Sequence, residues 1–265
     1  SLALTATDEI FTLDPPDAAS RWPGGLFHQI AGGHHGFPYQ FLTAAFRTLP
    51  SVSGQVVAAS GPSVIDTGGA LPEACAGGLF YCDPSVNAVV RLALRKSAGT
   101  FAPADREEVL SPGELSDFHP WGVAALVDGT GFWVLDRGQG GVGRLYRLTH
   151  AEAKPIGRMV QELDSSITGL VTHLDSPSLS VRLDAQQALA KQGPTARDAL
   201  IERLRDAKSE PGRIHALWAL DAINDASASA AIRSALTDAS ARLRLQAVRS
   251  AGIRADRQAV EPLTP

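Results

Sequence analysis

Two short clusters in the sequence combine histidine with aromatic residues, glycine and proline. The first covers residues 31–39, where His34 and His35 lie between glycines and an aromatic–proline pair follows. The second covers residues 117–121 and places His119 and Trp121 on either side of a proline. Constrained loops of this composition can direct their side chains into a ligand site. We therefore take His119, Trp121 and His35 as the candidate binding residues.

Each cluster also has a purely structural interpretation. A metal site at residues 31–39 would require a third donor, and His28 and Asp14 are the nearest candidates in sequence. A tight turn with glycines at positive φ explains the same residues without a metal, and packing between structural units explains residues 117–121. The sequence contains no nucleophile elbow, dinucleotide-binding glycine loop or phosphate-binding loop. It therefore predicts no metal ligand, and its catalytic residues stay unknown.

The region that contains both clusters has the pattern of β-structure. Short apolar runs at 78–83, 87–94, 123–127, 132–136 and 143–148 are separated by glycine, proline and Asp-Gly turns. A strand that ends in aspartate occurs at Asp83 and again at Asp136, which suits one four-stranded propeller blade and a loop. A blade takes roughly 40–50 residues, so residues 1–150 would supply about three blades. Since a closed ring needs at least about four, we expect the C-terminal part of a β-propeller, with further blades before Ser1.

The last third of the sequence instead repeats every 31 residues, as the rows Arg182, Arg213, Arg244 and Ala185, Ala216, Ala247 show. A repeat of this length indicates stacked pairs of helices. We expect about three HEAT-like units in residues 155–265, with helices at 196–205 and after Pro211, and with Asp175, Asp206 and Asp238 in the turns. The arginine row is expected at a solvated or inter-repeat position, where it could bind an acidic peptide. His215, which has no clustered partner, is expected to be structural.

Composition limits the remaining possibilities. The net charge of −4 argues against a nucleic-acid surface, and no stretch is long and apolar enough to span a bilayer. Cys75 and Cys82 are close enough in sequence for a disulfide, but two buried free thiols are the favoured interpretation. The only methionine is Met159, so we interpret the chain as a piece of a longer polypeptide.

Several motifs resemble those of soluble quinoprotein sugar dehydrogenases. Residues 28–39 are similar to their G-G-x-Y-G-W-P segment, 78–83 to a G-x-L-F-V-x-D blade strand, and 143–148 to a closing G-R-I-Y-R-V. Residues 117–136 are similar to a strand pair with the pattern R-P-x-x-x-x-x-x-D-G-x-L-Y-V-x-D. A related exported group places such a propeller before HEAT repeats and often a cytochrome c domain.

This resemblance implies a propeller that binds pyrroloquinoline quinone (PQQ) and calcium and oxidises a sugar or alcohol by hydride transfer. The family's catalytic histidine and Arg-Asn pair would lie upstream of these residues. His119, and more weakly Trp121 and His35, would contact the cofactor. The resemblance also implies an exported protein of the periplasm or cell envelope, a cytochrome-type electron acceptor, haem c in a downstream domain and a protein partner for the HEAT repeats.

Two other functions are compatible with the same motifs. His119 occupies the place of an arginine that would bind a quinone carboxylate at any pH, and this replacement favours a non-catalytic protein-binding scaffold built from a degenerate propeller and a solenoid. A metal-free carbohydrate-binding propeller is the third alternative.

Overall fold

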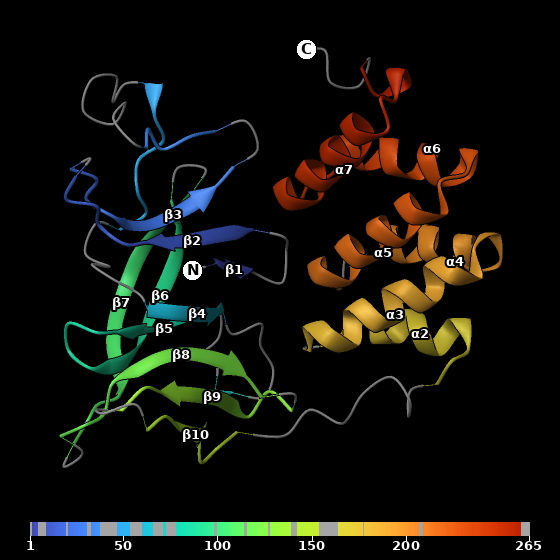
Figure 1. Ribbon diagram of the computed structural model, residues 1–265. Helices are drawn as coiled ribbons and strands as arrows, with labels where there is room; N and C mark the ends of the chain where they lie inside the picture. The colour runs from blue at the N-terminus through green and yellow to red at the C-terminus, as the bar shows by residue number, and fades with distance from the viewer. Residues whose placement is uncertain are drawn as a thin grey trace. The chain divides into compact units, whose positions relative to one another are not determined.

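The computed structural model describes most of the chain and divides it into two compact units, Ser1–Ile156 and Gly157–Pro265, here called the β unit and the helical unit (Figure 1). The described residues are 2–4, 9–19, 21–30, 33–37, 47–53, 60–65, 71–72, 78–97, 100–113, 116–126, 128–138, 142–153, 164–176, 178–206 and 209–260. Ala31, Gly32, Pro38, Tyr39 and Cys75 lie outside them.

The described strands of the β unit form three antiparallel sheets, which do not close into a ring. The first sheet contains β1 (Leu2–Leu4), β2 (Ile10–Asp14) and β3 (Gly25–Gln29). The second contains β4 (Ser60–Ile65), β5 (Leu79–Asp83), β6 (Ala88–Ser97) and β7 (Thr100–Leu110), in that order. The third contains β8 (Pro120–Ala125), β9 (Gly131–Asp136) and β10 (Arg144–Thr149).

The strands predicted from alternating apolar residues are present. The predicted hairpin of residues 78–94 is β5 paired with β6, with Asp83 opposite Ala88. The predicted pair at 132–148 is β9 and β10, with Asp136 opposite Arg144. The strand predicted at 123–127 is β8, but it begins earlier, at Pro120, where the proline stands opposite Asp136 next to a register shift.

One strand pattern occurs in all three sheets and sets how the sheets stack. The pattern consists of the last five residues of β2, β5 and β9, and its fifth residue is always an aspartate. Each of these strands pairs with the next strand along the chain. Because neighbouring residues of a strand point to opposite faces, the second and fourth residues of the pattern share one face. We call this the forward face, and the opposite one the backward face. Together with paired residues of the next strand, the forward-face residues are Phe11, Leu13 and Leu26 in the first sheet, Phe80, Cys82 and Val89 in the second, and Trp133, Leu135 and Leu145 in the third.

The second sheet is buried on both faces along β5 and the first half of β6. Its backward face, with Leu79 and Tyr81, forms a core with the forward face of the first sheet. Its forward face, with Phe80 and Cys82, forms a separate core with Phe132, Val134 and other residues of the third sheet. Figure 1 shows the β4–β7 sheet between the other two, consistent with these cores. The three sheets therefore stack face to face and in the same direction.

The described part of the helical unit contains three successive pairs of helices. The elements are α2 (Ile167–His173), α3 (Leu179–Gln192), α4 (Pro194–Arg205), α5 (Glu210–Ile223), α6 (Ala226–Ser234), η4 (Ala235–Thr237), α7 (Ala241–Ile253) and η5 (Arg257–Ala259). The helix expected at 196–205 is α4. The helix expected after Pro211 is α5, which begins one residue before that proline, because proline is tolerated in the first turn of a helix. Both predicted helices are thus confirmed.

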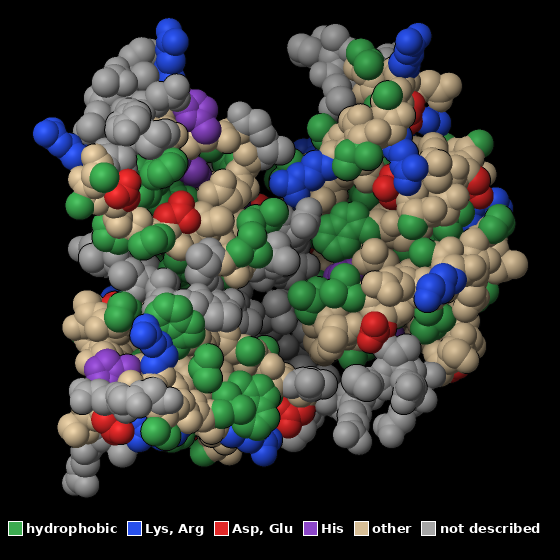
Figure 2. Space-filling view, in the orientation of Figure 1, with side chains coloured by type: hydrophobic (Ala, Val, Ile, Leu, Met, Phe, Trp, Pro, Cys, Tyr) green, Lys and Arg blue, Asp and Glu red, His purple; other side chains and the backbone are tan. Residues whose placement is uncertain are grey.

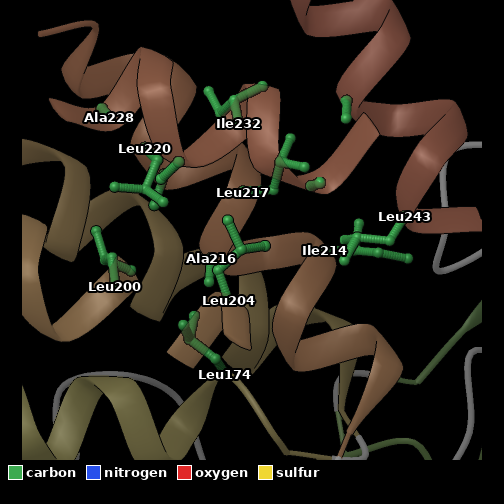
Figure 3. Close-up of a cluster of buried hydrophobic side chains, with 14 of the residues drawn as sticks. Leu174, Leu200, Leu204, Ile214, Ala216, Leu217, Leu220, Ala228, Ile232 and Leu243 are labelled. Carbon is green, nitrogen blue, oxygen red and sulfur yellow. The ribbon is translucent and has the colours of Figure 1, made fainter. Parts of the chain in front are cut away.

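Small and aliphatic side chains fill the core of the helical unit. Ala185, Ala216 and Ala247, the repeated alanine row, are all completely buried. Figure 3 shows Ala216 among the buried side chains of this core, including Leu204 and Leu220. Polar side chains at the turns cap the helices: Ser209 accepts a hydrogen bond from the amide of Gly212. Such caps satisfy amides that have no partner inside the helix.

The turn aspartates lie where they were expected. Asp238 accepts a hydrogen bond from the backbone amide of Ser240 at 2.8 Å, which is the predicted turn contact. Asp175 and Asp206 form ion pairs with the buried Arg203, which lies within α4. A buried guanidinium needs anionic partners, and the two aspartates supply them.

The arginine row occupies an inter-repeat position and is not a solvated face. Arg182 is only 3% exposed and donates to the carbonyl oxygen of Ser176 and to His215 Nε2. Arg213 donates to the carbonyl oxygen of Leu204 and forms an ion pair with Asp238 of the next repeat. An arginine at this point can satisfy carbonyls that the end of the preceding helix leaves without partners, which is why it is drawn inward.

His215 is structural, as expected. Its side chain is fully buried in α5, with Nδ1 2.7 Å from Gln186 Oε1 and Nε2 3.2 Å from Arg182 Nε. Since the arginine can only donate, His215 Nε2 accepts and Nδ1 carries the proton. Burial and the neighbouring Arg182 charge lower the pKa of His215 to about 3. The imidazole is therefore neutral and joins α3 to α5.

Candidate functional site

A buried carboxylate at the end of β9 organises the loop that holds His119. Asp136 is completely buried, and its Oδ1 accepts hydrogen bonds from the amides of His119 at 2.8 Å and Gly138 at 2.9 Å. Its Oδ2 accepts from Arg144 Nε at 2.9 Å. Burial alone would raise the pKa of Asp136, but the Gly138 and His119 amides and the Arg144 charge outweigh it, so the pKa is lowered. An ionised Asp136 therefore holds the backbone just before β8, at His119, and just after β9, at Gly138.

The side chain of His119 is half-buried, and one ring nitrogen is held by the loop. His119 Nδ1 lies 3.1 Å from the carbonyl oxygen of Asp117. Because a carbonyl can only accept, Nδ1 carries the proton and Nε2 of the neutral ring is an acceptor. Within the described part of the chain, Nε2 has no hydrogen-bond partner. The orientation of the ring is therefore set, while one nitrogen is available to a ligand.

Arg137 completes a small cluster with His119 and Trp121. The amide of Arg137 donates to the carbonyl oxygen of His119 at 3.0 Å, and its guanidinium lies 4.6 Å from the centre of the Trp121 ring. This is a cation–π contact, and Trp121 is still 38% exposed. The ion pairs among the described residues do not include Arg137. The cluster thus combines a cation, an imidazole nitrogen and exposed aromatic surface.

Sequence reasoning identified His119 and Trp121 but missed Arg137. Arg137 follows Asp136 directly, and the antiparallel pairing of β8 with β9 brings it to His119. The signal was the position of an arginine immediately after a strand that ends in a buried aspartate. A neighbouring arginine, Arg144, is less available, because it forms ion pairs with Asp117 and Asp136.

His35, the third candidate, lies apart from this cluster. Its Nδ1 is 2.9 Å from the carbonyl oxygen of Leu49, and its ring packs 4.7 Å from Phe27 of β3. No contact described for His35 involves the third sheet, which contains Trp121. Its Nε2 is buried and has no hydrogen-bond partner among the described residues. His35 therefore belongs to the surroundings of the first sheet.

The other residues weighed for metal binding or redox chemistry have structural contacts. His28 Nε2 is 2.8 Å from Glu9 Oε2, and His28 Nδ1 is 3.1 Å from Thr100 Oγ1. Within the described ranges, no three His, Cys, Asp or Glu side chains are grouped to hold a metal ion. Cys82 is a buried free cysteine, and burial raises the pKa of its thiol to about 12.

Comparison with known proteins finds a family match for part of the chain only. Residues 197–265, which lie in the helical unit, match the family model for HEAT repeats. No curated protein matches the chain. Repeats of this family are typical of protein interaction surfaces. Among the described residues, no helix is long and apolar enough to cross a membrane.

A solved structure that resembles the chain is a crystal structure titled as an oxidoreductase (glucose dehydrogenase) from Thermus thermophilus. The two share 19% sequence identity over 55% of this chain, with a TM-score of 0.41. This chain spans 43% of the length of that protein. At this TM-score the likeness does not establish a shared fold.

Proposed function

We propose that this chain is part of a quinoprotein sugar or alcohol dehydrogenase-like protein, in which the β unit is a propeller segment and the HEAT repeats are an interaction or spacer module. The observation that carries the proposal is the cluster of His119, Trp121 and Arg137, held in place by the buried Asp136. The identity of the ligand as a quinone comes from the family motifs. The directional stacking of three antiparallel sheets is the arrangement that propeller blades adopt.

Arg137 supplies the charge that is lost where His119 replaces the family arginine. A guanidinium stays protonated at every physiological pH and can donate two parallel hydrogen bonds to a carboxylate. The Arg137 amide donates a hydrogen bond to the His119 carbonyl oxygen. The two side chains therefore start from neighbouring positions, one after β9 and one before β8. An arginine contributed by the end of β9 can thus take the place of one contributed by the loop before β8.

The residues of the cluster fit one end of PQQ, which is a planar quinone that carries carboxylate groups. Arg137 would contact a carboxylate, and the exposed Trp121 ring would lie against the planar rings. His119 Nε2, an acceptor, would receive a hydrogen bond from an N–H or O–H group bound beside them. When bound, the quinone supplies the acceptor for the hydride taken from the substrate. Calcium, the sugar or alcohol, the cytochrome acceptor, haem c and export to the periplasm or cell envelope enter the proposal through the family motifs alone.

A PQQ titration followed by isothermal calorimetry tests the proposal. Loss of one charge-assisted hydrogen-bonding partner costs about 1.5–3 kcal/mol, so Arg137→Ala should weaken PQQ binding by roughly tenfold to a hundredfold. His119→Ala should weaken it less, because His119 Nε2 accepts a hydrogen bond and makes no charge-assisted bond to the carboxylate. Arg95→Ala is the matched control, since Arg95 is an exposed arginine on β6 of the second sheet. Equal affinities for the Arg137 and Arg95 variants would contradict the proposed site.

The alternative is a protein-binding scaffold without catalysis, and the HEAT repeats favour it specifically. Leu183 of α3 and Leu245 and Val248 of α7 are each about two-fifths exposed (37–40%), and exposed apolar side chains on repeat helices suit a protein partner. Calorimetry also separates the two functions. Absence of PQQ binding by the wild-type protein expressed from its complete gene would eliminate the dehydrogenase proposal and favour the scaffold.

A further inference from the structure

The forward face of the third sheet is exposed, although the same face is covered in the other two sheets. Trp133 and Leu135 of β9 are 41% and 45% exposed, and Leu145 of β10 is 61% exposed. Figure 2 shows hydrophobic side chains at the surface over the β8–β10 sheet. Scattered apolar residues are normal on a protein surface, but three large ones in adjoining positions of one sheet face form a patch.

Position by position, this face matches the buried forward face of the second sheet. Phe80 is paired with Arg91 and Cys82 with Val89, just as Trp133 is paired with Arg147 and Leu135 with Leu145. Residues paired directly across two strands share a face. In the second sheet all four of these residues are at most 9% exposed, and the third sheet covers its three apolar members.

The first sheet obeys the same rule. Phe11 is paired with His28 and Leu13 with Leu26, and the second sheet covers the three apolar members of this set. The fourth residue of each set is a basic side chain with an acidic side chain as its partner. These partners are Glu9 for His28, Glu107 for Arg91 and Asp128 for Arg147. Two of the three equivalent faces are therefore sheet–sheet interfaces, and the third has the same residue arrangement without a cover.

We propose that the forward face of the third sheet, formed by Trp133, Leu135, Leu145 and Arg147, is a docking surface for a fourth antiparallel sheet of the same polypeptide. This sheet lies outside residues 1–265 and docks with its backward face, as the third sheet docks on the second. The argument is continuity with two interfaces inside the β unit, and it does not depend on quinone binding.

A second copy of this chain fits the surface less well. If two forward faces met around a twofold axis, the apolar patches would bring Arg147 of each copy into one interface, where like charges oppose each other. A second copy could also dock through the backward face of its first sheet, but that face is a poor partner for an apolar surface. There Gln29 donates to Thr12 at 2.8 Å, and Phe27 is already covered, because Trp22 stacks on its ring. A fourth sheet with an apolar backward face would cover the patch without opposing two arginines and without pairing it with a polar face.

Hydroxyl-radical footprinting read by mass spectrometry tests the proposal on the protein expressed from its complete gene. Trp133 should be oxidised at least tenfold more slowly than in the chain of residues 1–265, and at a rate close to that of Trp22, which is 5% exposed. The protection should not change on dilution. Oxidation of Trp133 at the same rate in both proteins would overturn the proposal. Protection that disappears on dilution would overturn it too, because a second copy would then be the occupant.

A pair of substitutions gives an independent measurement. Leu135→Glu should lower the melting temperature of the complete protein by roughly 10 °C, because it places a carboxylate in the docked interface. In the chain of residues 1–265 the same change should have almost no effect. Val86→Glu is the control, since Val86 lies in the turn between β5 and β6 and is similarly exposed, at 40%. If both variants of the complete protein melt alike, the forward face of the third sheet is not covered.

Discussion

The alanine row of the helical unit provides the sharpest test of the repeat packing. Ala216 is fully buried in α5 and belongs to the continuous core that joins the three helix pairs (Figure 3). Ala216→Asp would place a carboxyl group there without an ion-pair partner. An unpaired buried charge costs several kcal/mol, and the extra atoms add about 1–3 kcal/mol of overpacking. A domain of this size is stabilised by about 5–15 kcal/mol in total.

We therefore expect Ala216→Asp to remove most of the stability of the helical unit. Thermal unfolding followed by far-UV circular dichroism should show loss of helix or a melting temperature lowered by roughly 15 °C or more. Ala222→Asp is the matched control, since Ala222 lies in the same helix but is exposed. A carboxylate near the end of a helix costs only about 0.3–1 kcal/mol. The packing argument is refuted if the two variants melt within a few degrees of each other.

Three further outcomes follow from groups with shifted pKa values. Asp136→Asn should cost about 2 kcal/mol at neutral pH in denaturant titrations, and the difference from wild type should shrink below about pH 4, where the ordinary aspartate protonates in the unfolded chain. For His215, whose pKa is about 3 when folded and 6.5 ordinarily, stability should fall as pH drops between these values, because only the unfolded chain gains a proton. His215→Gln should flatten that dependence; an unchanged slope would contradict it. In a Cys75→Ser variant, native Cys82 should react with a thiol reagent at least roughly a hundredfold more slowly than in denaturant at about pH 8, and equal rates would disprove its burial.

The strands that sequence reasoning located are those with two apolar faces or clear alternation. The apolar run in β5 is continuous because both sides of that strand are covered. β7 was missed, since its middle residues are charged and exposed and pair with β6 on one edge only. Its length comes from the partner strand rather than from its own pattern. Tertiary pairing of this kind is not visible in a local window of sequence.

The candidate site was predictable in its residue types but not in its contacts. His119 and Trp121 form a recognisable local cluster, whereas Arg137 reaches them only through the register of β8 and β9. The arginine row of the repeats was expected either at a solvated face or between repeats, and its burial was not foreseen. Arginine is rarely buried without partners, and the carbonyls that receive Arg182 and Arg213 become apparent only once the turns are folded.

Burial of β5 on both faces has a consequence for how this protein can change during evolution. Every apolar residue of β5 is constrained by a core, because Tyr81 packs toward the first sheet and Phe80 toward the third. Binding chemistry can therefore diverge mainly at the ends of strands, where Asp136 holds loops from which His119 and Arg137 lie outside both cores. The helical unit has a different freedom, since a repeat contacts only its neighbours and whole units can be gained or lost. The two halves of the chain can thus diverge at different rates and by different kinds of mutation.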